Sequence, residues 1–170
     1  MERVFKSKTY GLCSFEEVMK HITNRIKNDE QAGYLLVIGT DSQNHATSTR
    51  FANIIMLHTL GRGGIYFYLV HAEERINVLP NRMLEEAHQS IDIAKDMLNW
   101  FDEAYDEETF DYSKYNIKME IHCDVGVNGA SRDAIKSVLG WIHSEFGDSI
   151  QGMIKPSAVV ASGLADKYVR

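Results

Sequence analysis

Two aspartates, Asp41 and Asp124, directly follow segments that are typical of β-strands. The segment before Asp41 contains the continuous apolar run YLLVIG, and the segment before Asp124, NIKMEIHC, alternates apolar and polar residues. A sheet fixes the backbone at the end of a strand, while the side chain leaves the core into a crevice. Either aspartate alone is explained by an ordinary turn in which it accepts hydrogen bonds. As a pair, they predict two carboxylates that close two separate strands and form a metal-binding pair.

Carboxylates that are brought close together repel each other unless they share a proton or a cation. Oxygen ligands of this kind suit Mg²⁺ or Mn²⁺, which bind one or two carboxylates together with waters and phosphate oxygens. The seven histidines show neither an HxH nor an HExxH spacing, which argues against zinc. We therefore expect Asp41 and Asp124 to bind Mg²⁺ or Mn²⁺, and His122 to be structural.

The elements that must position this pair begin with a helix at about residues 14–28. Ser14 and Glu17 have the spacing of a capping box, in which each side chain accepts a backbone N–H of the other residue. Apolar residues then recur at helical spacing, namely Phe15, Val18, Met19, Ile22 and Ile26. This helix is expected to precede the sheet.

Two more strand-like segments, FANIIMLHTL and IYFYLVHA, follow the Asp41 strand. A glycine-rich turn over residues 61–64 joins them and predicts an antiparallel hairpin. The polar stretch before them, residues 42–50, is expected to be a loop. Three antiparallel strands in sequence disfavour an all-parallel sheet.

Glu86, the third candidate ligand, lies in a helix predicted from about Asn81 to Ala104. The expected buried face of this helix consists of Leu84, Ala87, Ile91, Ala94 and Leu98, with Met83 on one flank. Since a helix advances about 100° per residue, Glu86 lies at the border of this face, whereas Glu85 lies roughly 160° from Ala87. We therefore expect Glu86 to reach the site and Glu85 to face water.

Asp166 is the fourth candidate and lies in a last helix predicted after Pro156. Before it, a helix that ends at Gly147 and a short strand over residues 150–154 are predicted. The apolar stripe of the former helix consists of Ile135, Val138, Leu139, Ile142 and Phe146. Asp166 is the only acid after Asp148, which suggests a ligand role. A solvated helix residue is the alternative.

Length and composition favour one folded domain over residues 1–170. The chain has 44% hydrophobic and 25% charged residues, which is ordinary for a globular protein. Its two cysteines, Cys13 and Cys123, form no CxxC motif, so we expect reduced thiols in a cytoplasmic protein. No apolar run is long enough to suggest export or a membrane anchor. The formal net charge of -6 argues against long-range attraction of nucleic acid but leaves room for an acidic metal site.

The order of the predicted elements resembles the ribonuclease H-like fold. That superfamily places an Asp in the first strand, a Glu in the helix after the hairpin, an Asp at the end of the fourth strand and an acid in the last helix. Asp41, Glu86, Asp124 and Asp166 fill these positions in order. The resemblance implies an α/β fold with a mixed five-stranded sheet, in which strands 1–3 are antiparallel and the later strands parallel, flanked by helices.

More closely, four segments resemble the YkuK family of predicted ribonuclease H-like proteins over nearly the whole chain. These segments are IGTDSQ, LPNRMLEEAHQSIDIA, HCDVG and ASGLADKYV. The helix start NRMLEE departs from the NRME-like start of ribonuclease H, so the resemblance by itself leaves Glu85 and Glu86 as alternatives. The angular positions of the two residues around the helix favour Glu86.

The resemblance implies a divalent-metal-dependent nuclease that hydrolyses phosphodiester bonds of DNA or RNA. In this mechanism Asp41 is shared by two Mg²⁺ or Mn²⁺ ions, Glu86 and Asp124 are further ligands, and Asp166 completes the second site. The alternative is a non-catalytic domain of the same fold that binds nucleic acid or another protein.

Two further residues and one other class of protein are alternatives to consider beside the four carboxylates and the nuclease. His45 or Lys155 would assist charge stabilisation or proton transfer, with an ordinary surface or loop position as the alternative. A sugar-kinase or ATPase relative is opposed by the length of the chain and by the lack of a GxxxxGKS loop.

Overall fold

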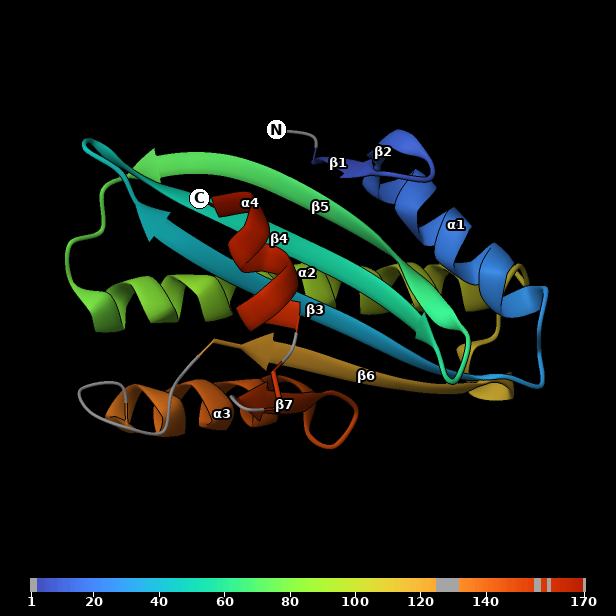
Figure 1. The fold of residues 1–170 in the computed structure, drawn as a ribbon. Coiled ribbons are helices and arrows are strands. Elements are labelled where there is room, and N and C mark those ends of the chain that lie inside the picture. The colour runs from blue at the N-terminus through green and yellow to red at the C-terminus, as the bar shows by residue number, and fades with distance from the viewer. Residues whose placement is uncertain (1–2, 125–131, 155–156, 159, 170) are drawn as a thin grey trace.

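The computed structural model describes residues 3–124, 132–154, 157–158 and 160–169 (Figure 1). The strands are β1 (Val4–Ser7), β2 (Gly11–Ser14), β3 (Gly33–Asn44), β4 (Ser48–Thr59), β5 (Gly63–Glu74), β6 (Asn116–Cys123) and β7 (Gln151–Ile154). The α-helices are α1 (Phe15–Lys27), α2 (Leu79–Asp106), α3 (Arg132–Phe146) and α4 (Asp166–Val169). A short 3₁₀ helix, η1 (Tyr112–Lys114), precedes β6, and a π-helix, η3 (Val160–Ala165), leads into α4.

The strands form one mixed sheet in the order β2-β1-β5-β4-β3-β6-β7. β3, β4 and β5 pair antiparallel, while β6 pairs parallel with β3 and β7 parallel with β6. The five strands from β5 to β7 therefore have the predicted directions, antiparallel in β3–β5 and parallel in β6 and β7. The ribonuclease H-like expectation for the sheet is confirmed in this part.

The predicted count of five strands is wrong because a hairpin of β1 and β2 lengthens the sheet beyond β5. Each of its strands has only four residues, too few for a periodic pattern to stand out. The hairpin buries Phe5 and Cys13 against the core, and its β1 strand pairs with β5 at Lys6 and Tyr68. The helix α1 follows directly, with the predicted capping box of Ser14 and Glu17.

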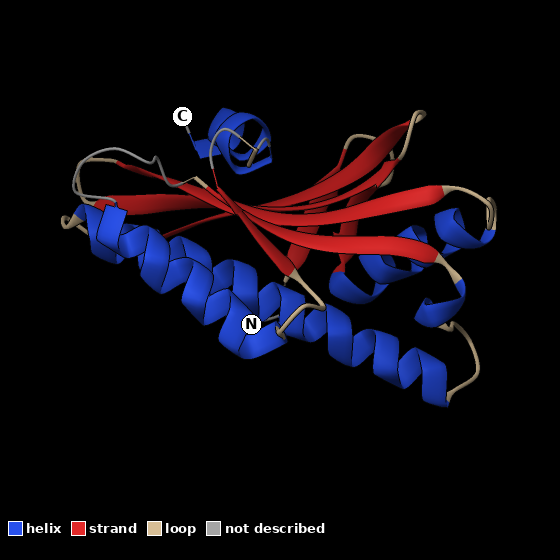
Figure 2. Ribbon diagram, turned by 90° about the horizontal axis from the view of Figure 1, so that it is seen from below, coloured by secondary structure: helices blue, strands red, loops and turns tan. Residues whose placement is uncertain are grey.

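Helices cover the two faces of the sheet unequally. Figure 2 shows the long helices on one side and the short C-terminal helix on the other. The larger core lies on the side of α1, α2 and α3, and includes Tyr34, Leu36 and Ile38 of β3. The smaller core joins the opposite face to η3 and α4 through Val37, Ala52, Ile54, Val160, Ala165 and Val169.

The buried face of helix α2 is turned from the predicted one, although Ala87, Ile91 and Ala94 are buried as predicted. Leu84, expected inside, is 37% exposed, whereas Met83, expected on the flank, is 5% exposed. The helix is turned because its inner face includes the polar residues Glu86 and Ser90, which both have hydrogen-bonding partners on β3. A pattern of apolar residues alone does not predict which polar residues are buried and hydrogen-bonded to the sheet.

The polar stretch 42–50 is mostly strand, so its prediction as a loop is wrong. β3 continues to Asn44 and β4 begins at Ser48, which leaves residues 45–47 as the connection. The polar side chains satisfy one another within this hairpin, since the Thr49 hydroxyl donates to the Asn44 amide oxygen at 2.6 Å. β3 consequently continues through Asp41, beyond the last residue that pairs with β6.

Within the described residues, no helix combines the length and apolar character that spanning a bilayer requires.

Gly64 at the start of β5 offers a test of how tightly this sheet is packed. A Cβ added there would lie 2.4 Å from the carbonyl oxygen of Leu57, so the backbone must shift. We expect Gly64→Ala to lower the free energy of unfolding by about 1–3 kcal/mol in urea denaturation. Gly140 in α3 is the matched control, because its added Cβ meets nothing within 4 Å. Gly140→Ala should raise stability by up to about 1 kcal/mol, and equal effects of both changes would contradict this account.

Candidate functional site

The candidate site lies at a step in the sheet, where β6 ends and β3 continues. The last pair of their parallel ladder is Thr40 with Cys123, so Asp41 and Asp124 are the next residues of the two chains. Asp124 follows β6 directly, as predicted. Asp41 does not close its strand, contrary to prediction, since it lies inside β3 and pairs with Ala52 of β4.

Glu86 of α2 reaches the same step from the helix-covered face. The Ser42 hydroxyl donates a hydrogen bond to Oε1 of Glu86, and the Thr40 hydroxyl bonds that of Ser90 on the same helix. Because side chains alternate along a strand, Asp41 between them points to the opposite face. Asp41 and Glu86 are 9% and 8% exposed. At the early end of β6, Asp41 and Glu86 thus approach the same step in the sheet from its two faces.

The pKa of Glu86 shows how closely these charges are gathered. It rises from 4.5 to about 8, chiefly through burial, and the charges of Asp41 and Asp124 act in the same direction. The hydrogen bond from Ser42 and the positive charge of Arg82 oppose this rise. Three of the four predicted carboxylates therefore share one electrostatic environment, and Glu86 holds a proton near neutral pH.

Cys123 lies beside this environment but keeps its proton. Burial raises the pKa of its thiol to about 12, and the charge of Glu86 adds to the shift. A thiolate ligand is disfavoured by this surrounding, since a thiolate needs a lowered pKa.

Glu85 is turned away from the three acids. Its Oε1 accepts a hydrogen bond from Nε2 of Gln89 at 3.1 Å and lies 3.7 Å from Nδ1 of His88. His88 is exposed, and Gln89 is half-buried. The helix thus directs Glu86, and not Glu85, toward Ser42 at the step in the sheet.

Asp166 begins α4 on the face of the sheet to which Asp41 points. The C-terminal segment is tied there by aromatic and backbone contacts. The Tyr168 hydroxyl lies 3.0 Å from that of Tyr66, and its ring stacks on Tyr68 at 3.9 Å between centroids. His45, considered above for proton transfer, places Nε2 3.3 Å from the Val169 carbonyl. The other residue considered there, Lys155, lies outside the described residues.

His122 anchors the beginning of the same segment and fits its expected structural role. Its Nδ1 accepts the backbone N–H of Val160 at 3.3 Å, so the ring proton is on Nε2. Nε2 then donates to Glu120 at 2.8 Å. Both ring nitrogens are therefore used within the protein.

The residues at the step fit an oxygen-preferring divalent cation by their chemistry. Asp41, Glu86 and Asp124 bring only carboxylates into a buried environment in which their charges repel. In the part of the chain that is described, no three His, Cys, Asp or Glu side chains are grouped closely enough to hold one ion. Glu86 would therefore have to exchange its Ser42 hydrogen bond for a bond to the metal.

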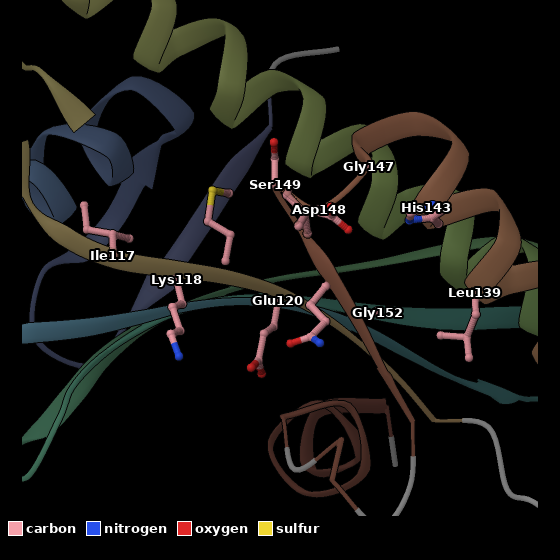
Figure 3. Close-up of a pocket in the computed structure, with 12 residues that line it drawn as sticks. Ile117, Lys118, Glu120, Leu139, His143, Gly147, Asp148, Ser149 and Gly152 are labelled. Atoms are coloured by element: carbon pink, nitrogen blue, oxygen red, sulfur yellow. The ribbon is translucent and has the colours of Figure 1, made fainter. Parts of the chain in front are cut away.

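A separate pocket of about 560 Å³ lies at the edge of the sheet between β6, β7 and the end of α3 (Figure 3). Lys118 and Glu120 point to one side of β6, whereas Ser149 lies on the other side. None of the four candidate carboxylates lines this pocket. The candidate site is therefore the step in the sheet and not this hollow.

Sequence reasoning missed two polar residues that support Glu86. Ser42 was assigned to a loop, and Asn53 stands inside an apolar strand segment. A signal was present for both. Ser42 follows Thr40 at the two-residue spacing of one strand face. Asn53 is the single amide residue in the apolar segment FANIIMLHTL, and its side chain is 2% exposed in the fold.

The fold and its acids define a ribonuclease H-like domain, with a β5-β4-β3-β6-β7 core and carboxylates on β3, on α2 and after β6. The model of the family described as Ribonuclease H-like matches residues 17–170, and the chain belongs to this family. The chain is also 28% identical over 170 residues to a protein of Bacillus subtilis (strain 168) named uncharacterized protein YkuK. That alignment covers 98% of this chain and 97% of the relative, which confirms the YkuK resemblance. No solved structure matches the chain significantly.

The raised pKa of Glu86 predicts that, without metal, stability falls as the pH rises from 4.5 to about 8. Between pH 4.5 and about 8 the folded protein keeps a proton that the unfolded chain releases. The free energy of unfolding should therefore fall as pH rises, by at most about 1.4 kcal/mol per pH unit from this group. Glu86→Gln should remove this slope in urea denaturation with EDTA. Glu85→Gln is the matched control and should keep it, and a slope unchanged in Glu86→Gln would contradict the assignment.

Proposed function

We propose that the protein is a divalent-metal-dependent nuclease that hydrolyses phosphodiester bonds of DNA or RNA. The observation that carries this proposal is the Glu86 carboxyl group, whose pKa is raised mainly by burial and also by the charges of Asp41 and Asp124. A cation would relieve the repulsion among these groups, and Mg²⁺ or Mn²⁺ prefers such oxygen ligands. Membership of the ribonuclease H-like family supports the same positions for the acids.

In this proposal Asp41, Glu86 and Asp124 hold the metal, and Asp166 approaches from the C-terminal helix. Bound Mg²⁺ or Mn²⁺ would supply activation of water and stabilisation of the leaving oxygen. Asp41 is fixed for this task because its Oδ1 accepts the backbone N–H of Ser42 at 2.8 Å. Rigid ligands lower the cost of ordering the site when substrate arrives.

The groups around the acids prepare them for a change of charge state. The Ser42 hydroxyl orients Glu86, and the positive charge of Arg82 favours its ionised form. Burial opposes ionisation and is the larger effect. Glu86 therefore gives up its proton readily only when another positive charge is brought to the site.

A non-catalytic domain of the same fold is the second candidate. It is favoured because Glu86 is stable in the fold without a metal: it is neutral near pH 7 and accepts a hydrogen bond from Ser42. The formal net charge of -6 also gives no general attraction for nucleic acid. In this case the acids would stabilise the fold and would gain nothing from a metal.

Metal-dependent thermal stability separates these two candidates. At a concentration 100 times the dissociation constant, Mn²⁺ should stabilise the nuclease by about 2.7 kcal/mol, which corresponds to about 5–10 °C in Tm for this size. Asp41→Asn should abolish the shift because it removes a ligand charge. The exposed Asp148→Asn is the matched control and should retain it.

Cleavage of end-labelled single-stranded, duplex and hybrid substrates then tests turnover. Wild-type protein and Asp148→Asn should cleave at least one of them with Mn²⁺, while Asp41→Asn should lose at least about 100-fold in rate. Unchanged Tm with Mg²⁺ and Mn²⁺, together with no cleavage by wild type, would overturn the proposal in favour of the non-catalytic domain.

A further inference from the structure

A chain of buried hydrogen bonds connects the centre of the sheet to the backbone of Glu86. Nδ2 of Asn53 on β4 lies 2.9 Å from the Thr40 hydroxyl, which lies 2.8 Å from the Ser90 hydroxyl. The Ser90 hydroxyl lies 3.0 Å from the carbonyl oxygen of Glu86. Asn53, Thr40 and Ser90 are each at most 2% exposed.

The direction of every bond in this chain is determined by its two ends. An amide nitrogen can only donate, so Asn53 donates to the Thr40 oxygen. A carbonyl can only accept, so Ser90 donates to Glu86. The Thr40 proton is then left to donate to Ser90. A single arrangement satisfies all the groups, and the loss of one hydroxyl breaks the chain.

Asn53 also holds the neighbouring residue of the helix. Its Nδ2 lies 2.9 Å from Oε1 of Gln89. The Gln89 amide nitrogen in turn donates to Glu85 at 3.1 Å and to Glu73 of β5 at 3.3 Å. The second branch thus ends at the carboxylate that is turned away from the site.

Two adjacent helix positions are therefore fixed against two adjacent strands. Ser90 is tied to Thr40 of β3, and Gln89 is tied to Asn53 of β4. One such contact would leave the helix free to pivot, whereas contacts about 100° apart around the axis fix its rotation. A rotation of one residue would exchange Glu86 for Glu85 at the step in the sheet.

We propose that the Asn53–Thr40–Ser90 hydrogen-bond chain is a positioning device that sets the rotation of α2, so that Glu86 and not Glu85 faces Ser42 at the step in the sheet. The inference rests on the proposed function for its catalytic meaning, because Glu86 is there a metal ligand. The placement of the helix itself does not depend on that function. Thr40, Ser90 and Asn53 act through Glu86 and touch no substrate in this account.

Two substitutions of Thr40 separate the hydrogen bond from the packing. Thr40→Val keeps the shape of the side chain but leaves the Asn53 amide and the Ser90 hydroxyl without their partner. Thr40→Ser keeps the hydroxyl and loses a buried methyl group. We expect Thr40→Val to weaken Mn²⁺ binding at least about tenfold in calorimetric titration, and Thr40→Ser to stay within about threefold of wild type. Ile55→Val, on the face of β4 that carries Asn53, controls for the loss of a methyl group outside the hydrogen-bond chain.

Cysteine labelling measures the rotation of the helix without metal. Cys13 and Cys123 are both buried, so a maleimide reports mainly on a cysteine introduced at position 85 or 86. In the wild-type background, Glu85→Cys should react at least about tenfold faster than Glu86→Cys. Thr40→Val should bring the two rates together, whereas Thr40→Ser should keep them apart.

The two measurements fail in different ways. If wild type binds no Mn²⁺ but the labelling rates behave as expected, the proposed function is wrong and the positioning role stands. If Thr40→Val and Thr40→Ser give the same affinity and the same labelling ratio, the positioning role is overturned. Should Thr40→Val fail to fold, Ser90→Ala breaks the same chain from the helix side and gives the same test.

Discussion

The burial of one carboxyl group, that of Glu86, is the constraint on which the architecture around the site depends. A carboxylate in an apolar layer is costly unless it is neutral, paired or bound to a metal. Ser42 supplies a donor, Arg82 supplies a positive charge, and burial keeps the proton in place. The long strand β3 is needed for this arrangement, because Ser42 lies beyond the last residue that pairs with β6.

The two faces of the sheet contribute to the site by different means. On the helix-covered face, the support for Glu86 comes from buried side-chain hydrogen bonds within a large apolar core. On the other face, the C-terminal segment is held at its start by His122 and near its end by Tyr168. Burial, together with the neighbouring phenols of Tyr66 and Tyr68, raises the pKa of Tyr168 well above its ordinary range, so this contact is insensitive to physiological pH. The site therefore lies between two layers that are held in place by separate sets of contacts.

The parts of this structure that could be predicted are those that follow from the hydrophobic periodicity of each segment and from the order of the segments along the chain. Strand β6, the β4–β5 hairpin and the placement of Asp124 all come from local patterns that agree with the fold. The turn of α2 could not be predicted from its apolar residues, because the partners of Glu86 and Ser90 lie more than forty positions earlier in the chain. The extension of β3 through Ser42 was hidden for a similar reason, since Ser42 is satisfied by Glu86 of α2 and Asn44 by Thr49 and the Ile76 carbonyl. Long-range hydrogen bonding thus decided what local hydrophobicity left undetermined.

The short pairing between β1 and β5 has a consequence for how copies of this protein meet one another. Because β1 pairs with β5 at Lys6 and Tyr68, the later part of β5 runs past the hairpin as a sheet margin. That part ends with two exposed acids, Glu73 and Glu74. Charged residues on a margin repel an incoming strand of the same kind. In a crowded solution, copies that approach along this margin would bring like charges together before their backbones could pair.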